Sequence, residues 1–374
     1  MSSNGVLSAV DRIATDVVSA NAAKTDAEAT FPKASMDALA QAGLFGLVSA
    51  PEVGGKGQSF RAAAEVIDRI AQECGSTAMV LTMHYCGSAV LEKYADIATR
   101  KDVAAGRHLS TLAFSEEGSR SMFWAPMSTA RKEGANIRLD AKKSWITAAH
   151  HATAYVWSSR PVAAEGPSTI WLVPSDATGL DRAPRYDGLG LRGNDSTPVI
   201  ASGVRIPESN RLGEDGQGFG IMMETVLPMF NVLSSACSVG LMTGAIARMA
   251  KHAGATKFEH LGSSLAEQPA TRQHIARAQI KADLARALLF DTITALETGR
   301  PDAMLRVLEV KAAAGDTASE VLGLCMRVCG GAAYRRDVAV ERYFRDAQAA
   351  SVMAPTTDTL QDFIGKAVCG LPLF

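Results

Sequence analysis

The sequence lacks an excess of charge of either sign. Its 374 residues include 38 lysines and arginines and 39 aspartates and glutamates, which gives a formal net charge of −1 at pH 7. Proteins that bind nucleic acid or an anionic membrane surface carry a clear basic excess. We therefore expect neither kind of partner. Apolar residues make up 47% of the chain, which is typical of a folded protein and argues against disorder.

The sequence also has little that would direct the chain to a membrane or out of the cell. No apolar run approaches the roughly 18–20 residues that a membrane span needs. Residues 1–12 lack a basic segment followed by an apolar stretch, so no secretory signal is expected. The cysteines are scattered, without histidines at metal-ligand spacing, so we expect buried free thiols, no metal site and a cytoplasmic location. They are Cys74, Cys86, Cys237, Cys325, Cys329 and Cys369.

What is present divides the chain into three regions, with predicted boundaries at 1–110, 111–216 and 217–374. The first is rich in alanine and has apolar residues at helical spacing. The second alternates short strand-like segments with turns, which predicts an antiparallel, barrel-like β-domain. The third has long helices with short connections, which favours a helical bundle. We therefore predict a mostly α-helical protein with a central β-domain. Its main helices are expected at 36–42, 60–74, 76–91, 221–253, 270–298, 303–329 and 338–350.

Two segments thirty residues apart offer a binding site for a flat ligand. Ser115 follows an apolar strand and opens a loop rich in glycine and hydroxyl groups, which supplies backbone N–H groups and short donors. Trp145 and Thr147 are two residues apart in a strand-like segment, so their side chains are expected on the same face. A flat apolar ring beside a hydroxyl group suits a flavin. We interpret the two segments together as a candidate flavin site.

Six segments, in order, resemble the acyl-CoA dehydrogenase family of flavoproteins. They are the loop at 112–121, the Lys-x-Trp-Ile-Thr strand at 142–147, and the segments at 189–197, 204–207, 212–219 and 327–334, the last followed by 341–347. The resemblance covers most of the chain. It implies FAD as cofactor, α,β-dehydrogenation of an acyl thioester, and electron transfer to an electron-transfer flavoprotein. It also implies a homodimer or homotetramer, since the family's FAD site is shared between chains.

The resemblance assigns roles residue by residue. Ser115 stands where a hydroxyl bonds the flavin pyrimidine, Trp145 where a ring lies against the flavin, and Thr147 where a hydroxyl bonds near its reactive N5. Gly330 and Gly331 stand where a neighbouring subunit approaches the adenine half of FAD. The full set expected to bind the cofactor is Phe114, Ser115, Ser121, Trp145, Thr147, Arg327, Gly330, Gly331 and Thr356.

The chain departs from the family pattern at the catalytic base. Ala354 stands where the usual glutamate is expected, and alanine cannot accept a proton. Asp358 is our candidate replacement, because in a helix it would lie one turn further on the same side; the alternative is a helix cap. Glu117 and Glu224 are weaker candidates. The segment 228–232 also lacks an acid, and Asn231 replaces an expected arginine.

This departure leaves three functions open. The first is the dehydrogenase reaction, on a short, branched or otherwise unusual acyl group, which the Trp-Ile-Thr strand favours. The second is a flavin-dependent monooxygenase or oxidase, with His84 as the candidate catalytic residue. The third is a flavin-binding paralogue without chemistry. The residues expected to bind substrate are Ser121, Arg120, Tyr85 and Phe230, with Arg120 as a partner for a carboxylate or phosphate.

Overall fold

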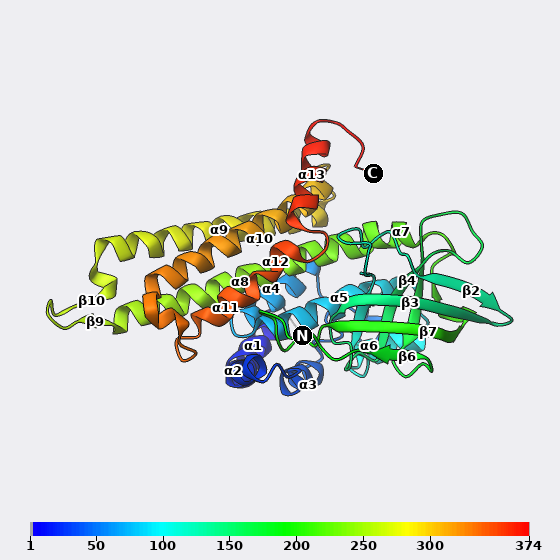
Figure 1. Ribbon diagram of the computed structural model, residues 1–374, viewed down its shortest axis with the longest axis horizontal. Coiled ribbons are helices and arrows are strands. Elements are labelled where there is room, and N and C mark those ends of the chain that lie inside the picture. The colour runs from blue at the N-terminus through cyan, green and yellow to red at the C-terminus, as the bar shows by residue number, and fades with distance from the viewer. Residues whose placement is uncertain (1–2, 374) are drawn as a thin grey trace.

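Helices form both ends of the chain, and two small sheets form its middle (Figure 1). The computed structural model describes residues 3–373. The N-terminal helices pack beside the central bundle, and the β-domain lies at one end of both. The predicted order of helices, strands and helices is therefore confirmed.

The N-terminal region contains six α-helices around the long helix α5. This helix carries no charged residue from Gly75 to Leu91 and is buried on almost every side, as expected for a helix that is apolar all round. The preceding helix stops earlier than predicted, because Gly75 begins α5 instead of ending its predecessor. The helices are α1 (Ser3–Ile13), α2 (Ser19–Ala27), α3 (Lys33–Gln41), α4 (Phe60–Ala71), α5 (Gly75–Tyr94) and α6 (Ile97–Ala104), with a π-helical turn at Ala14–Val18.

The β-domain consists of two four-stranded sheets rather than the barrel-like structure that we predicted. Each sheet ends in short edge strands, so the sheets stay open and share an apolar core that includes Trp157 and Trp171. The pairing is antiparallel except between β1 and β4. One sheet has the order β1 (Ser110–Ala113), β4 (Ala154–Ser159), β5 (Thr169–Pro174), β8 (Arg211–Leu212); the other has β2 (Thr129–Glu133), β3 (Asn136–Ile146), β7 (Thr197–Pro207), β6 (Leu180–Arg182).

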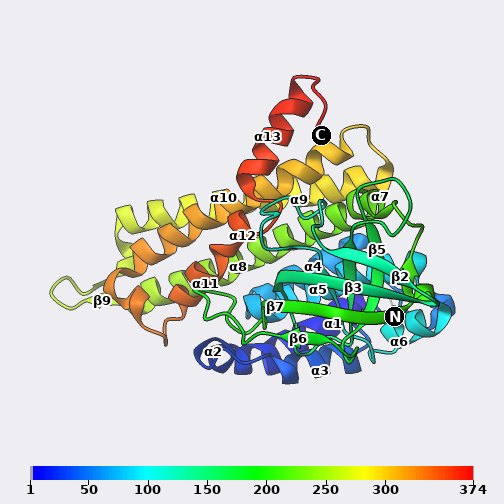
Figure 2. The ribbon, with the colours of Figure 1, turned by 45° about the vertical axis from the view of Figure 1, so that its right-hand side comes forward.

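The C-terminal bundle is built on three long helices that lie side by side (Figure 2). They are α8 (Leu227–Ala255), α9 (Pro269–Thr298) and α10 (Ala303–Cys329). A short helix α7 (Gly218–Ile221) and a π-helical turn (Met222–Val226) precede α8, and a small hairpin of β9 (Lys257–Phe258) and β10 (Ser263–Ser264) precedes α9. The helix predicted at 338–350 is two helices, α11 (Val340–Ala347) and α12 (Ala349–Val352), followed by α13 (Thr357–Val368).

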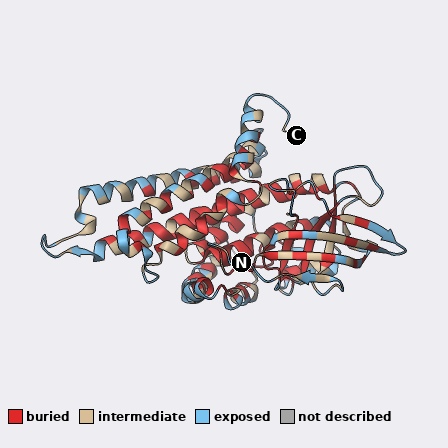
Figure 3. Ribbon diagram, in the orientation of Figure 1, coloured by how far each residue is buried: buried red, intermediate tan, exposed pale blue. Residues whose placement is uncertain are grey.

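The stretch Gly218–Ala255 corrects one expectation, because it contains an 18-residue window with a mean hydropathy of 1.5. By length and composition alone it could cross a membrane. However, 89% of that window is buried inside the molecule, as in the central helix of a bundle (Figure 3). All six cysteines are free thiols; five are buried, but Cys369 is exposed, unlike our expectation.

A cavity between the β-domain and the bundle

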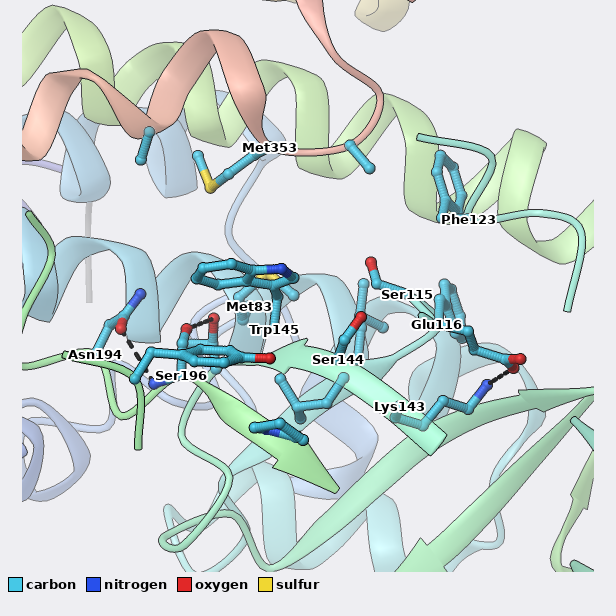
Figure 4. Close-up of a pocket in the computed structure, with 18 of the residues that line it drawn as sticks. Met83, Ser115, Glu116, Phe123, Lys143, Ser144, Trp145, Asn194, Ser196 and Met353 are labelled. Carbon is cyan, nitrogen blue, oxygen red and sulfur yellow. Dashed lines mark hydrogen bonds and ion pairs between the residues drawn. The ribbon is translucent and has the colours of Figure 1, made fainter. Parts of the chain in front are cut away.

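A cavity of about 1150 Å³ opens where the β-domain meets the bundle. Its volume exceeds the roughly 300–1,000 Å³ that is usual for small-molecule sites, so it has room for more than one small ligand. Its walls come from the loop after β1, from β3, from the segment 183–200, from α5 and α8, and from the segment 349–356. Figure 4 shows that Met353 and Trp145 lie on opposite sides of the open space.

The β-domain wall brings Ser115, Trp145 and Thr147 together. The backbone N–H of Ser144 donates to the Ser115 carbonyl at 2.9 Å, which joins the loop to β3. The side chain of Trp145 stays accessible, with 63% of the residue exposed, and its ring packs on Tyr186 with centroids 4.2 Å apart.

The alternation that we expected for Trp145 and Thr147 is interrupted. A register shift lies between Lys143 and Ile146, and Trp145 has a φ of +58°. The bulge turns the indole toward the cavity, while Thr147 is only 6% exposed and also lines the cavity. Both side chains therefore line the cavity, although not through a regular strand.

A buried ion pair between Glu116 and Lys143 holds the loop that begins at Ser115 against β3. The Lys143 ammonium lies 2.5 Å from the Glu116 carboxylate, and their side chains are 0% and 3% exposed. Glu116 also accepts from the backbone N–H groups of Met127 and Ser128, at 2.8 and 2.9 Å. Burial lowers the pKa of Lys143 to about 8, although the Glu116 charge acts in the opposite direction. Nothing in the sequence identifies Glu116 and Lys143 as a pair except that each lies inside one of the two motifs.

The opposite wall is the segment 349–356, which comprises the short helix α12 and the turn that leads to α13. Met353 and Ala354 line the cavity, so the position of the usual base presents a methyl group. Thr356 also lines it and caps α13 by accepting from the Thr359 backbone N–H. Its own N–H donates to the Ser121 hydroxyl at 2.9 Å. Ser121 therefore joins the β-domain loop to this wall.

Part of the cavity lining is apolar. Met79 and Met83 of α5 face it one helical turn apart, and Phe230 of α8 faces it as well. Phe114 and Phe123 stack with ring centroids 6.4 Å apart. Of our expected residues, Phe114 and Phe230 thus belong to the apolar lining. Such a lining suits a hydrocarbon chain.

The loop before β7 is held in place by residues of the segment 341–347. The backbone N–H of Leu191 donates to the Asp346 carboxylate at 2.6 Å. Arg345 pairs with Asp26 and with Glu341, each at 2.6 Å. Burial raises the pKa of Asp346 to about 6. These contacts explain why the motifs at 189–197 and 341–347 occur together.

The structure does not place Asp358 at the cavity. Its side chain is exposed, and the residue is absent from the cavity lining. Asp358 would point to the same side as Ala354 only if one helix ran through both residues. However, α12 ends at Val352 and α13 begins at Thr357. Helical spacing therefore does not apply, and Thr356 caps α13 instead. Glu224 does not line the cavity either.

His84 and Tyr85 also lie outside the cavity, which corrects our expectation for both. They follow Met83 on α5, so their side chains point away from the face that lines the cavity. The backbone N–H of Ser110 donates to His84 Nδ1, and Nε2 lies 3.1 Å from the Phe45 carbonyl. Burial lowers the pKa of His84 to about 3, so the ring is neutral. The Tyr85 hydroxyl donates to the Leu44 carbonyl.

The charged residues in the lining are mostly basic. Arg120 lines the cavity with an exposed side chain and a φ of +54°, a conformation that costs a non-glycine residue roughly 1–3 kcal/mol. The carboxylates in the described lining are Glu116, paired as above, and Glu117, which is exposed. The other basic residues are Lys142, Lys143, Arg185 and Arg192.

Arg327, Gly330 and Gly331 do not line the cavity of their own chain. All three are exposed, at the end of α10 and the start of the short helix Gly330–Tyr334. A role for them at this chain's own cavity is thus not supported by their position. A role toward a neighbouring chain stays a prediction.

Comparison with known proteins agrees with this architecture. Domain profiles of acyl-CoA dehydrogenases match residues 4–105 (N-terminal domain), 111–204 (middle domain) and 216–369 (C-terminal domain). The human mitochondrial short-chain specific acyl-CoA dehydrogenase is 27% identical over 345 residues, covering 90% of this chain and 82% of that protein. The probable acyl-CoA dehydrogenase FadE25 of Mycobacterium tuberculosis is 26% identical over 367 residues, covering 96% and 94%.

Solved structures share the fold at lower sequence identity. Butyryl-CoA dehydrogenase from Megasphaera elsdenii superposes with a TM-score of 0.91 at 19% identity, covering 98% of both chains. The prolyl acyl carrier protein oxidase AnaB superposes with a TM-score of 0.89 at 17% identity, covering 98% of both chains. The three domain profiles together span almost the whole chain, in the order in which the structure places the helical, β and helical regions. The chain belongs to the acyl-CoA dehydrogenase family, whose enzymes are oxidoreductases that act on CH–CH groups.

Proposed function

We propose that the cavity binds FAD along its β-domain wall. The observation that carries this proposal is the meeting of Ser115, Trp145 and Thr147 on one wall of a single cavity. Hydroxyl groups and an accessible indole suit the polar edge and the flat face of a flavin ring. Ser121 and Thr356, which bridge the two walls, would hold its phosphate-bearing part. Bound FAD would supply the two-electron acceptor that an oxidation requires.

The reaction that these residues support best is α,β-dehydrogenation of an acyl thioester. The apolar lining residues of the cavity, which include Met79, Met83 and Phe230, would hold the acyl chain and exclude water from it. Desaturation removes a hydride from the β-carbon, for which bound FAD would be the acceptor, and the α-proton, which needs a base. Ala354 cannot be that base. We infer that the proton leaves to water or to Glu117, the exposed carboxylate in the described lining.

Arg120 would select the substrate through charge. Its guanidinium lines the cavity without a hydrogen-bond or ion-pair partner among the described residues, in a left-handed conformation that glycine would adopt without strain. An acyl thioester with a carboxylate or phosphate near the cavity would give it a partner. Arg120→Gly should raise KM about tenfold for such a substrate and leave a neutral acyl thioester unaffected. Equal effects on both substrates would contradict this role.

We further propose that the enzyme works in the cytoplasm as a homo-oligomer and passes its electrons to an electron-transfer flavoprotein. The chain has the same three domains, in the same order, as its acyl-CoA dehydrogenase relatives, which supports an electron-transfer flavoprotein as the acceptor of its electrons. The exposed position of Gly330 and Gly331 supports a site shared between chains.

The test begins with the visible spectrum of the purified protein, which should show bound flavin. Anaerobic titration with straight, branched and dicarboxylic acyl-CoA thioesters should then bleach the flavin, and added electron-transfer flavoprotein should restore its colour. A colourless protein that does not take up FAD would refute the cofactor assignment. Flavin that no thioester bleaches would refute the reaction but leave the cofactor assignment intact.

A second candidate, a flavin-dependent monooxygenase or oxidase, draws support from one observation. The residues that line the cavity from the segment 349–356 include no carboxylate, so the usual proton acceptor is missing at Ala354. An oxygen-using reaction does not need that base at the same place. Oxygen consumption that depends on the thioester, or on externally reduced flavin, would favour this candidate. Electron transfer to the carrier protein without oxygen consumption would favour the dehydrogenase.

A further inference from the structure

We propose that Lys311 is a positioning residue that fixes the cavity wall at Ala354. Lys311 lies on α10, behind this wall, and is 2% exposed. Its ammonium donates to three backbone carbonyls: Ala350 at 3.3 Å, Met353 at 3.0 Å and Pro355 at 2.7 Å. An ammonium has three N–H donors, so the three carbonyls use all of them. The carbonyls on both sides of Ala354 are thereby tied to one side chain.

The surroundings of Lys311 leave these carbonyls as its hydrogen-bonding partners. No acidic side chain forms an ion pair with it among the described residues. From α8 it faces the uncharged side chains of Ser234, Ser235 and Ser238. Its ammonium also lies 5.9 Å from the centre of the Phe230 ring, which lines the cavity. Burial alone lowers the pKa of Lys311 to about 7.

A buried cation without an acidic partner is costly, so its position needs a compensating interaction. Here the compensation is one carbonyl of the short helix α12, that of Ala350, and two carbonyls of the turn between α12 and α13, those of Met353 and Pro355. That turn has no continuous helix of its own to satisfy its two carbonyls, since α12 ends at Val352 and α13 begins at Thr357. The anchor for the bundle side of the wall is therefore Lys311. The anchor for the β-domain side is Ser121, which accepts from the Thr356 N–H.

The two anchors together set the separation between the two cavity walls. Met353 faces the wall that carries Trp145 (Figure 4), and Ala354 lines the same cavity. Without the ammonium, three buried carbonyls lose their donors, and the wall must move or admit water to satisfy them. We infer that Lys311 acts on substrate binding through this wall. This part of the inference rests on the proposed function; the restraint of the wall does not.

The first measurement is hydrogen exchange of the FAD-loaded protein without substrate. Lys311→Met keeps the length of the side chain and removes its donors. It should speed exchange in residues 349–356 by about tenfold or more, corresponding to the loss of one or two buried hydrogen bonds. Lys311→Arg retains donors and should restore part of the protection. Lys281→Met, which removes a lysine that pairs with Glu320 at the bundle surface, is the matched control and should leave this segment unchanged.

The second measurement separates KM from kcat with whichever acyl-CoA thioester bleaches the flavin. Lys311→Met should raise KM about tenfold, change kcat less than about threefold, and retain the flavin spectrum. Unchanged exchange in 349–356 would overturn the inference, whatever the activity. If Lys311→Met does not fold, Lys311→Gln and the partial rescue by Lys311→Arg decide it by the same exchange measurement. If no thioester reacts, faster exchange still supports the restraint, and the proposed function fails separately.

Discussion

At the scale of single residues, the chain keeps the side chains that suit a flavin and changes the one that would take the proton. Ser115, Trp145 and Thr147 lie on one wall, and the methyl group of Ala354 lies on the other. Because the wall around Ala354 is held by Lys311 and Ser121, a longer side chain there would project into a defined space. The site therefore offers a direct test through the restoration of a base.

Ala354→Glu should increase the rate of flavin reduction by an acyl-CoA thioester. A positioned general base contributes roughly 10²–10⁴-fold, so an increase of at least about 10²-fold is expected. Stopped-flow absorbance under anaerobic conditions measures it. Ala354→Gln is the control, since it has nearly the same shape without the basic carboxylate. An equal increase in both variants, or none in either, would show that the substrate does not present its α-carbon to this wall.

At the scale of elements, the loop after β1 depends on the buried pair of Glu116 and Lys143. Removing one partner of a buried ion pair leaves an uncompensated charge and typically costs about 3–5 kcal/mol. Lys143→Met should lower the unfolding free energy by about that amount. The double variant Glu116→Gln/Lys143→Met should lose less, because it leaves no isolated charge. Denaturant unfolding followed by circular dichroism measures the unfolding free energy of both variants. A double variant that loses as much as Lys143→Met, or more, would contradict the coupling between the two charges.

Asp346 of α11 holds the loop before β7 by accepting from the Leu191 N–H. Burial raises the pKa of Asp346 from 3.8 to about 6, so the folded protein holds this proton more tightly than the unfolded chain. Its stabilising contribution is complete below pH 4 and is lost as the pH rises through 6. The wild type should therefore lose up to about 3 kcal/mol relative to Asp346→Asn between pH 4 and 7. Parallel stability curves for the two proteins would contradict the raised pKa.

The elements that the sequence predicted well are those with strong local patterns. The long helices at 270–298 and 303–329 lie within one residue of α9 and α10. The predicted helix at 338–350 missed the break between α11 and α12. The sequence left open whether one helix runs through 354 and 358 or a new helix is capped there; a new helix begins, with Thr356 as its cap, and Lys311 and Ser121, which are distant in the sequence, bind the turn before it. The placements of Asp358 and His84 were wrong for a similar reason. Their orientation depends on where a helix begins and which face is packed, and neither is visible in spacing.

At the scale of the whole molecule, the sequence predicted three regions in the observed order, but open sheets replaced the expected barrel. Strand spacing shows how many strands follow one another, whereas closure depends on which edges pair. The cavity shows the same limit. Motifs far apart in the sequence converge on it, yet the residues that hold its walls, Lys143 and Lys311, were identified only from their buried contacts.

The last prediction concerns whether one chain completes the flavin site of another. Gly331 lies outside its own chain's cavity, and a Cβ atom added there would meet no atom within 4 Å. Gly331→Trp should therefore fold normally as a single chain. If Gly331 approaches the FAD of a neighbouring chain, the indole should release bound flavin or dissociate the oligomer.

Light scattering with flavin absorbance measures both effects. Gly254→Trp, at another glycine with open space around it, is the matched control and should retain flavin and assembly. A Gly331→Trp protein that keeps both would place the whole FAD site within one chain. Arg327 and Gly330 would then not bind the flavin either, because both are exposed and lie outside their own chain's cavity, so they could contact a flavin only across an interface.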